Sequence, residues 1–288
     1  MTRTIYRERI PATDPRCRRH VLHDSRAWDY RHDTTGLSVA SVEHKRTLPI
    51  LDQGQVGSCT AEDGFGVLGT DPYYSPTLGQ LVAKAFGSFD QAGAYRLYSA
   101  EENLDGDGPY PPNDQGSTGL TLAKVLRAAG LISGWTQTFT LTDALKALTQ
   151  YPLSSGTYWF NSMFDPSPEG VVTVSKSSGV AGGHEYEVVG YDDAKGLVKC
   201  ANSWSASWGA AGYFYMQAED WGTLLHQQGD VTIFTPLTQP APTPVPPTPG
   251  DPDHQLLADL AHWLGERHVG DNAHAKTAVL RWKTEKGL

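Results

Sequence analysis

Hydrophobic spacing divides the chain into a helical first half and a strand-rich second half. Up to about residue 150, apolar residues recur at helical spacing and predict helices at about Thr60–Gly69, one or two over 81–102, one over 119–130 and one that Thr142 opens. From 153 onward, short runs predict strands in TYWF, VVTVS, HEYEVVGYD, GLVKCANSW, GYFYMQ and DVTIF. Helices followed by strands favour an α+β fold. A cleft between two such halves is a natural place for a functional site.

The two ends of the chain differ in composition from this middle part. Residues 1–35 hold eight arginines against five acidic residues, a net +3 that leaves −12 for the rest of a chain whose total is −9. We therefore predict that 1–47 is an extended basic arm lying on an acidic body, followed by the main folded domain over 48–235. Residues 236–253 contain eight of the nineteen prolines and predict a semi-rigid spacer.

The last segment, 254–288, has the apolar spacing of a helical hairpin. A unit of fewer than about 40 residues seldom folds alone. We therefore expect this helical module to dock on a protein partner, on another copy of the chain, or on the chain's own main domain.

Composition also excludes several classes of protein. The net charge of −9 argues against a nucleic-acid binder. No apolar run approaches the roughly 18 residues of a membrane span, and the first twenty residues lack an apolar leader. We expect a cytoplasmic protein, or a virion-associated one if it is phage-encoded. Three cysteines provide no disulfide framework and suit a reducing compartment.

Two groups of residues resemble metal ligands by spacing alone. The first has the pattern C-x₂-H-x₂-H and comprises Cys17, His20 and His23. It lies among arginines without a convincing fourth ligand, so we do not predict zinc. The second lies in a loop rich in Gly and Pro and comprises Asp105, Asp107 and Asp114. EF-hand spacing is absent, so a solvated turn is the better interpretation. No metal or cofactor is expected.

The candidate nucleophile is Cys59, at the point where the loop QGQVGS becomes a helix. Unsatisfied N–H groups and the helix dipole favour a thiolate there, although a lone cysteine is more often an inert core thiol. Two later motifs could supply a base and a group that orients it. In GGHEYEVVGYDD, His184 opens a strand after two glycines, and in NSWSASWGAAGYF, Asn202 follows the next strand. A hairpin of these strands can bring His184 beside Asn202, completing nucleophile, base and orienting group. The glycines allow another backbone to approach closely.

These three blocks together resemble the papain-like cysteine peptidases. Q-x₅-C, GGH on a strand ending in VGYD, and NSW-x₃-WG-x₂-GY follow the family's order over about residues 46–235, and DQGQVGSCTA looks closer to bacterial and phage-type members. The resemblance implies a two-lobed fold, with a helical lobe packed on an antiparallel sheet or barrel lobe and the site in the cleft. It also implies a cysteine endopeptidase that needs no cofactor and acts on protein or peptide substrates.

The resemblance assigns four catalytic positions. Cys59 would be the nucleophile, His184 its base and then acid, and Asn202 the group that orients the imidazole. Gln53 would donate its side-chain amide to the oxyanion together with the backbone N–H of Cys59. Trp204 would cover the His–Asn hydrogen bond.

The resemblance also implies a substrate site. Its further positions are Gly116, Ser117, Gly183, Trp204 and Trp208, with Trp208 on the leaving-group side. Two departures from the family stand out: Thr60 where an aromatic residue usually follows the nucleophile, and Glu185 where a small apolar residue usually follows the histidine. Glu185 would border the pocket for the second residue before the cut, where a carboxylate favours Lys or Arg. Alternatively, Glu185 and Glu187 share a solvent face.

Two other functions stay open on the sequence. A Cys–His peptidoglycan hydrolase often combines a catalytic domain, a Pro-rich linker and a small C-terminal module. A structural docking protein could retain the peptidase fold, with the C-terminal hairpin as its attachment. The filled catalytic positions favour the peptidase.

Overall fold

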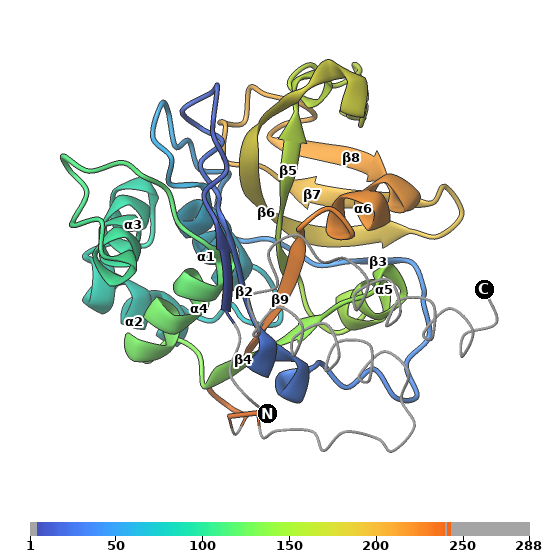
Figure 1. Cartoon of the computed structure of the whole chain (residues 1–288). Coiled ribbons are helices and arrows are strands. Elements are labelled where there is room, and N and C mark those ends of the chain that lie inside the picture. Colours follow the sequence, from blue (N-terminus) through green and yellow to red (C-terminus); the bar gives the residue numbers. More distant parts are fainter. Residues whose placement is uncertain (1–4, 240, 243–288) are drawn as a thin grey trace, which may run out of the picture.

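The computed structural model describes residues 5–239, 241 and 242 of the chain. The predicted Pro-rich spacer lies mostly outside the described residues, and the predicted helical module of 254–288 lies entirely outside them. The described part has helices on one side and a sheet on the other (Figure 1). This arrangement confirms the predicted α+β class.

Four helices build the first lobe: α1 (Cys59–Leu68), α2 (Pro76–Phe86), α3 (Gln91–Asp105) and α4 (Gly119–Ala128). At the starts of α2, α3 and α4, the side chains of Ser75, Asp90 and Thr118 accept backbone N–H groups, as good N-caps do. The helices enclose an apolar core that includes Phe65, Val82, Leu97, Leu122 and Leu126. The lobe therefore follows from the helical spacing of its apolar residues.

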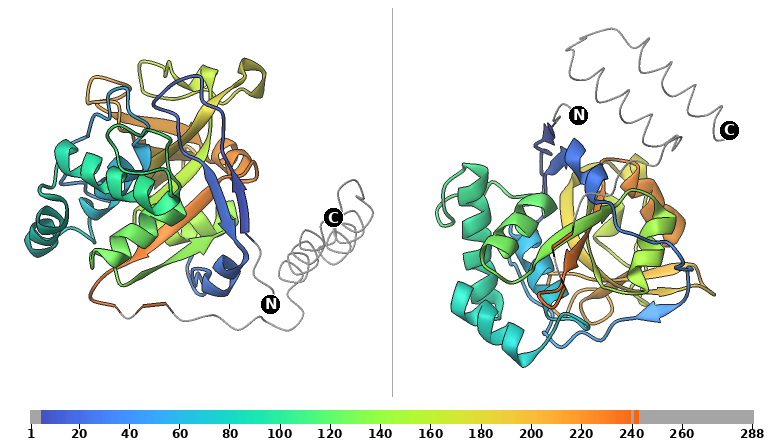
Figure 2. Two further views of the ribbon diagram at one scale, coloured as in Figure 1. Left: turned by 60° about the vertical axis from the view of Figure 1, so that its left-hand side comes forward. Right: turned by 90° about the horizontal axis from the view of Figure 1, so that it is seen from below.

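An antiparallel sheet builds the second lobe. Its strands are β3 (Val42–Glu43), β4 (Gly134–Thr138), β5 (Leu153–Phe160), β6 (Val180–Asp192), β7 (Leu197–Ala201), β8 (Tyr213–Gln217) and β9 (Asp230–Thr235). The order is β4-β9-β5-β6-β7-β8, with β3 pairing β6, so these strands form an open sheet and not the closed barrel that was the alternative. Helices α5 (Leu141–Leu148) and α6 (Ala218–Leu225) pack on it (Figure 2).

One strand prediction is wrong. The run VVTVS, residues 171–175, makes only an isolated bridge between Val171 and Tyr215. Other backbone groups of this run bond to a side chain instead of a strand. The Ser162 hydroxyl donates to the carbonyl of Thr173 and accepts from the N–H of Ser175. The hydrophobic spacing also failed to predict two elements. One is β4, which pairs with β9 and whose inward residues are polar, and the other is the short helix α6.

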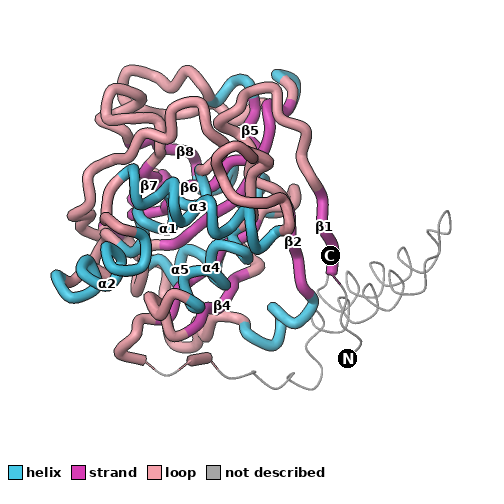
Figure 3. Tube along the Cα trace, turned by 90° about the vertical axis from the view of Figure 1, so that its left-hand side faces the viewer, coloured by secondary structure: helices cyan, strands magenta, loops and turns pink. Residues whose placement is uncertain are grey.

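The arm has more structure than predicted. Strands β1 (Ile5–Glu8) and β2 (Val21–Asp24) pair antiparallel, and a short 3₁₀ helix, Ser25–Tyr30, follows them. Seen from the helical side, β1 and β2 run along one edge of the molecule (Figure 3). Residues 9–20 connect the two strands.

The aspartates of the predicted solvated turn anchor this arm. Arg7 lies 3.8 Å from Asp105, Arg9 pairs with Asp107, and Arg18 lies 3.9 Å from Asp114. These three arginines of the arm thus face acids of the helical lobe. Within the described residues, no helix has the length and apolarity that crossing a membrane requires.

Candidate active site

Cys59 is the first residue of α1, and its side chain is fully buried. Helix α1 packs against β6. The main-chain N–H of Glu185, the residue after His184, lies within hydrogen-bonding reach of the thiol. Burial raises the pKa of Cys59 well above its usual range, and the N–H of Glu185 opposes this rise. The thiol is therefore neutral in this covered state.

His184 lies on β6 and Asn202 directly follows β7. The antiparallel register of β6 and β7 pairs Glu187 with Ala201. This pairing brings the side chains of His184 and Asn202 together. His184 Nε2–H donates to Asn202 Oδ1 over 2.7 Å, and the backbone N–H of Ser203 holds the same oxygen at 2.8 Å. The imidazole Nδ1 is buried and makes no hydrogen bond. Asn202 thus fixes the tautomer in which Nδ1 can accept a proton.

Aromatic rings enclose the imidazole. The ring centroids of Trp204 and Trp159 lie 4.8 and 5.0 Å from that of His184. Burial lowers the pKa of His184 to about 4, and the hydrogen bond to Asn202 opposes this. Trp208 lies farther out, with its indole N–H bonded to the carbonyl of Phe164 at 3.0 Å. Sequence reasoning placed Trp159 in a strand but missed its place beside the histidine, which only the β5–β6 pairing reveals.

Gln53 is fully buried, and its amide has a defined orientation. Its Oε1 accepts from the Ser203 hydroxyl at 2.6 Å and from the indole N–H of Trp204 at 3.0 Å. Its Nε2 therefore faces the other way and donates to the carbonyls of Val56, at 2.7 Å, and Arg16, at 3.1 Å. The Arg16 carbonyl of the arm therefore lies against this amide donor.

The arm fills the rest of the cleft. The N–H of Gly183 donates to the carbonyl of Cys17 at 3.2 Å, the N–H of Arg19 to the carbonyl of Gly183 at 3.0 Å, and the N–H of His20 to the carbonyl of Ser117 at 2.7 Å. A side chain at Gly116 would collide with the carbonyl of Arg18. The glycines therefore admit a second backbone, and in this structure it is the chain's own arm.

Side chains of the arm also contact Trp204 and the core of the sheet lobe. The guanidinium of Arg16 lies 4.4 Å from the centre of the Trp204 ring, held by Asp14 through bonds of 2.9 and 2.8 Å. Cys17 packs into the core of the sheet lobe. Both ring nitrogens of His20 have backbone partners, Ile10 and Gln115. Among the described residues, no three His, Cys, Asp or Glu groups could hold a metal ion.

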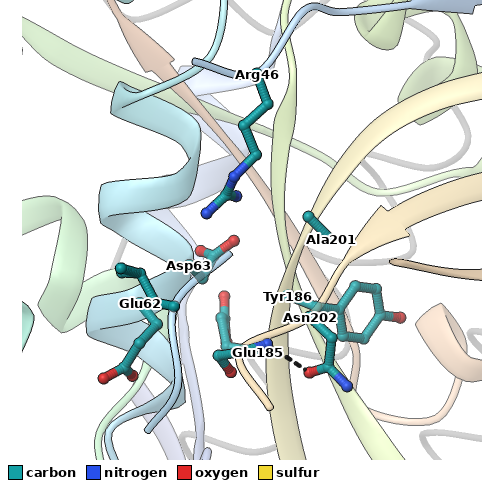
Figure 4. A pocket seen from close by; sticks show the side chains of 9 residues that line it. Arg46, Glu62, Asp63, Glu185, Tyr186, Ala201 and Asn202 are labelled. Carbon is teal, nitrogen blue, oxygen red and sulfur yellow. Dashed lines mark hydrogen bonds between the residues drawn. The ribbon is translucent and has the colours of Figure 1, made fainter. Parts of the chain in front are cut away.

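Glu185 and Glu187 do not share a solvent face, so that alternative is wrong. Both are buried, because their face of β6 is covered by the helical lobe. Glu187 pairs with Arg46. Glu185, with Glu62 and Asp63 of α1, lines a cavity of about 10 Å³ behind the site, with Arg46 directed toward Asp63 (Figure 4). Burial raises the pKa of Asp63 well above its usual range.

Thr60, the other departure from the family, has a clear partner. Its buried hydroxyl donates to the carboxylate of Glu101 on α3. An aromatic side chain at this position would leave that buried acid without its donor.

Comparison with known proteins agrees with this geometry. Residues 87–229 match the model of the papain family cysteine proteases. The chain is similar to xylellain, a cysteine protease from Xylella fastidiosa, at 18% identity and a TM-score of 0.58, covering 81% of this chain and 99% of xylellain. It also matches procathepsin L 3 of Tenebrio molitor larval midgut, at 17% identity and a TM-score of 0.43, covering 72% of this chain and 74% of that one. None of the curated proteins matches the chain.

Fold and family model together define a two-lobed cysteine protease. The chain is a papain-like cysteine peptidase. The family match includes His184 and Asn202 but begins after Gln53 and Cys59.

Proposed function

We propose that the chain hydrolyses peptide bonds within proteins or peptides through the thiol of Cys59. His184 takes the thiol proton on Nδ1, Asn202 keeps the ring in place, and Gln53 binds the oxyanion. The observation that carries the proposal is the Arg16 carbonyl, an amide oxygen of the chain itself that lies against Gln53 Nε2. A substrate carbonyl in the same place would meet the same donor.

The reaction divides into two half-reactions. The Cys59 sulfur, after losing its proton to His184, attacks the carbonyl carbon, and the peptide C–N bond breaks as His184 returns the proton to the departing amine. The acyl group is then held as a thioester. His184 takes a proton from water, the water oxygen attacks the thioester carbon, and the C–S bond breaks. A carboxylic acid leaves, and the thiol is restored.

The pKa shifts describe a resting state. With the arm in the cleft, burial keeps the thiol of Cys59 and the imidazole of His184 neutral. Removing the arm admits water, which lowers the pKa of the thiol and raises that of the imidazole. The proposed active form is thus the arm-displaced one, in which thiolate and imidazolium can form.

The test is selective modification of the thiol. The full-length protein is incubated with an epoxide inhibitor of papain-like enzymes, and the adduct is mapped by peptide mass. We expect modification at Cys59 and its loss in His184→Ala. Cys200 is the internal control, because it lies on β7 outside the arm, is buried, and burial raises its pKa. Equal labelling of all three cysteines would contradict the proposal.

A further inference from the structure

The arm places one side chain in a charged pocket beside the catalytic group. The side chain of Arg19 is completely buried. Its guanidinium pairs with Asp230, lies 3.5 Å from Glu185 Oε2, and donates to the carbonyl of Gln228 at 3.0 Å. An arginine so deep inside a protein is uncommon unless its charge is matched, and here two carboxylates match it.

The walls of this pocket are shaped for a guanidinium. A Cβ on Gly156 of β5 would lie 2.3 Å from Arg19 Nε and 2.4 Å from Glu185 Oε2. A Cβ on Gly119, at the start of α4, would lie 2.6 Å from Glu185 Oε1. Glycine at both positions leaves the space that the guanidinium and its partner carboxylate fill. Four separate elements, β5, β6, α4 and β9, supply the pocket.

The pocket is next to the reacting atoms. Glu185 follows His184 directly, and the backbone N–H of Arg19 bonds to the carbonyl of Gly183, which precedes the histidine. Arg16, whose carbonyl lies at the oxyanion donor Gln53, is only three residues from Arg19. A peptide that adopts the same backbone pairing would therefore place a side chain in this pocket within a few residues of its scissile bond.

The charges of the pocket select its occupant. Glu185 and Asp230 are largely shielded from solvent, and their side-chain exposures are 0% and 9%. An apolar side chain would leave both carboxylates without a partner in a place that water reaches poorly. A guanidinium has several donors in a planar fork, and it can bond to two carboxylates and a carbonyl at once, which an ammonium group does less well.

We propose that Glu185 and Asp230 form the specificity pocket of this peptidase, that the pocket binds the guanidinium of a substrate arginine, and that Arg19 is its resting occupant. This inference rests on the proposed function, because it names the substrate class of that same site. The notable partner is Asp230, which lies 45 residues from Glu185 in the sequence.

The first test measures competition between substrates. The full-length enzyme digests an equimolar mixture of peptides that differ at one position as arginine, lysine, glutamine or norleucine, and each product is quantified by mass spectrometry. We expect arginine to exceed norleucine by about 10²-fold at one position within a few residues of the cut. Because all peptides meet the same enzyme molecules, this ratio does not depend on how many of those molecules have lost their arm.

Variants connect that ratio to the two carboxylates. Glu185→Gln and Asp230→Asn should each lower the preference for arginine about tenfold. Glu187→Gln is the matched control, since it neutralises another buried carboxylate of β6 that faces Arg46 and not this pocket. An arginine preference that is absent, or unchanged in both pocket variants, overturns the inference. Cleavage that depends on Cys59 but ignores arginine would leave the proposed function intact.

The second test needs no turnover. In Arg19→Ala with the additional change Cys59→Ala, the pocket lacks its occupant and the protein cannot react. We expect butylguanidine to raise the thermal midpoint of this variant, and 1-aminobutane, which has the same chain and charge but an ammonium group, to raise it less. The effect should vanish when Glu185→Gln is added. Equal shifts with both compounds, or a shift that survives Glu185→Gln, would overturn the inference even if the protein proves inactive.

Discussion

Asn202 decides which nitrogen of His184 carries the proton. Its Oδ1 accepts from Nε2–H at 2.7 Å, which leaves Nδ1 without a proton and without a partner. The strand pairing of β6 and β7 supplies this contact, and the backbone N–H of Ser203 keeps the amide oxygen in position. The same hydrogen bond supports the imidazolium, since it raises the pKa of His184 against the effect of burial.

Replacing Asn202 should therefore alter both rate and pH dependence. We expect Asn202→Ala to lower kcat/KM for a peptide by about 10²-fold. Loss of the hydrogen bond lowers the pKa of His184, so the imidazolium is lost at a lower pH and the basic limb of the pH–rate profile moves down. A profile of kcat/KM against pH checks this. Asn161→Ala, which removes an exposed asparagine, is the control. An unmoved basic limb would contradict the orienting role.

Gln53 should act mainly on kcat. We expect Gln53→Ala to lower kcat by about 10²-fold with little change in KM, because its amide stabilises charge that develops only in the transition state. Ser203→Ala is an informative comparison, because it removes one hydroxyl that holds Gln53 Oε1 but leaves the donor. Its loss of kcat should be below about tenfold. Equal losses in the two variants would mean that Gln53 acts only as a support for Trp204.

The arm should inhibit the enzyme that carries it. Arg19→Ala in the full chain removes one partner of a buried charge group, a loss that costs about 3–5 kcal/mol when the other charges stay buried. Docking of the arm weakens accordingly, and initial rates on a peptide without arginine should rise about tenfold or more. Arg26→Ala, which removes an arginine paired with Asp24 away from the cleft, should leave the rate unchanged. A rate in Arg19→Ala at or below that of the wild type would show that the arm does not restrict access.

Glu62 should limit stability at alkaline pH. Burial raises its pKa to about 8 in the folded chain, above the unfolded value of about 4.3. The folded state therefore binds more protons between these values, so this group's contribution to stability falls as pH rises through the window. Glu62→Gln keeps an acceptor for Ser58 and Gln91 but cannot ionise.

We expect Glu62→Gln to match the wild type near pH 5 and to exceed its unfolding free energy by on the order of 3 kcal/mol at pH 9. Urea denaturation at the two pH values measures the difference. The exposed change Glu169→Gln is the control. A variant that is less stable than the wild type at both values would mean that Glu62 is held in its charged form.

Local spacing in the sequence was sufficient for most elements. Helices α1 and α4 and the strands β6 and β7 lie within a few residues of their predicted bounds, because burial of one face imposes a period of 3.6 or 2 on the apolar residues. The run VVTVS shows the limit of this signal. Its residues are suited to a strand, but a strand forms only where a partner strand is available. The hydrophobic spacing of one segment does not show whether such a partner exists.

The candidate catalytic residues were predictable because each stands in a block whose residues are close in sequence. Their mutual contacts were not. Gln53 meets Ser203 and Trp204 across 150 residues, and Trp159 reaches His184 only through the pairing of β5 with β6. Such contacts depend on topology, which hydrophobic periodicity does not encode.

The sequence by itself determined the class of fold, the order of the catalytic motifs and the charge surplus of the arm. Only the tertiary structure decided where that arm goes. It places the Arg16 carbonyl at Gln53 and the Arg19 guanidinium between Glu185 and Asp230. The physical reason is that a buried charge must find its partners in space, and these partners come from strands far apart in the chain.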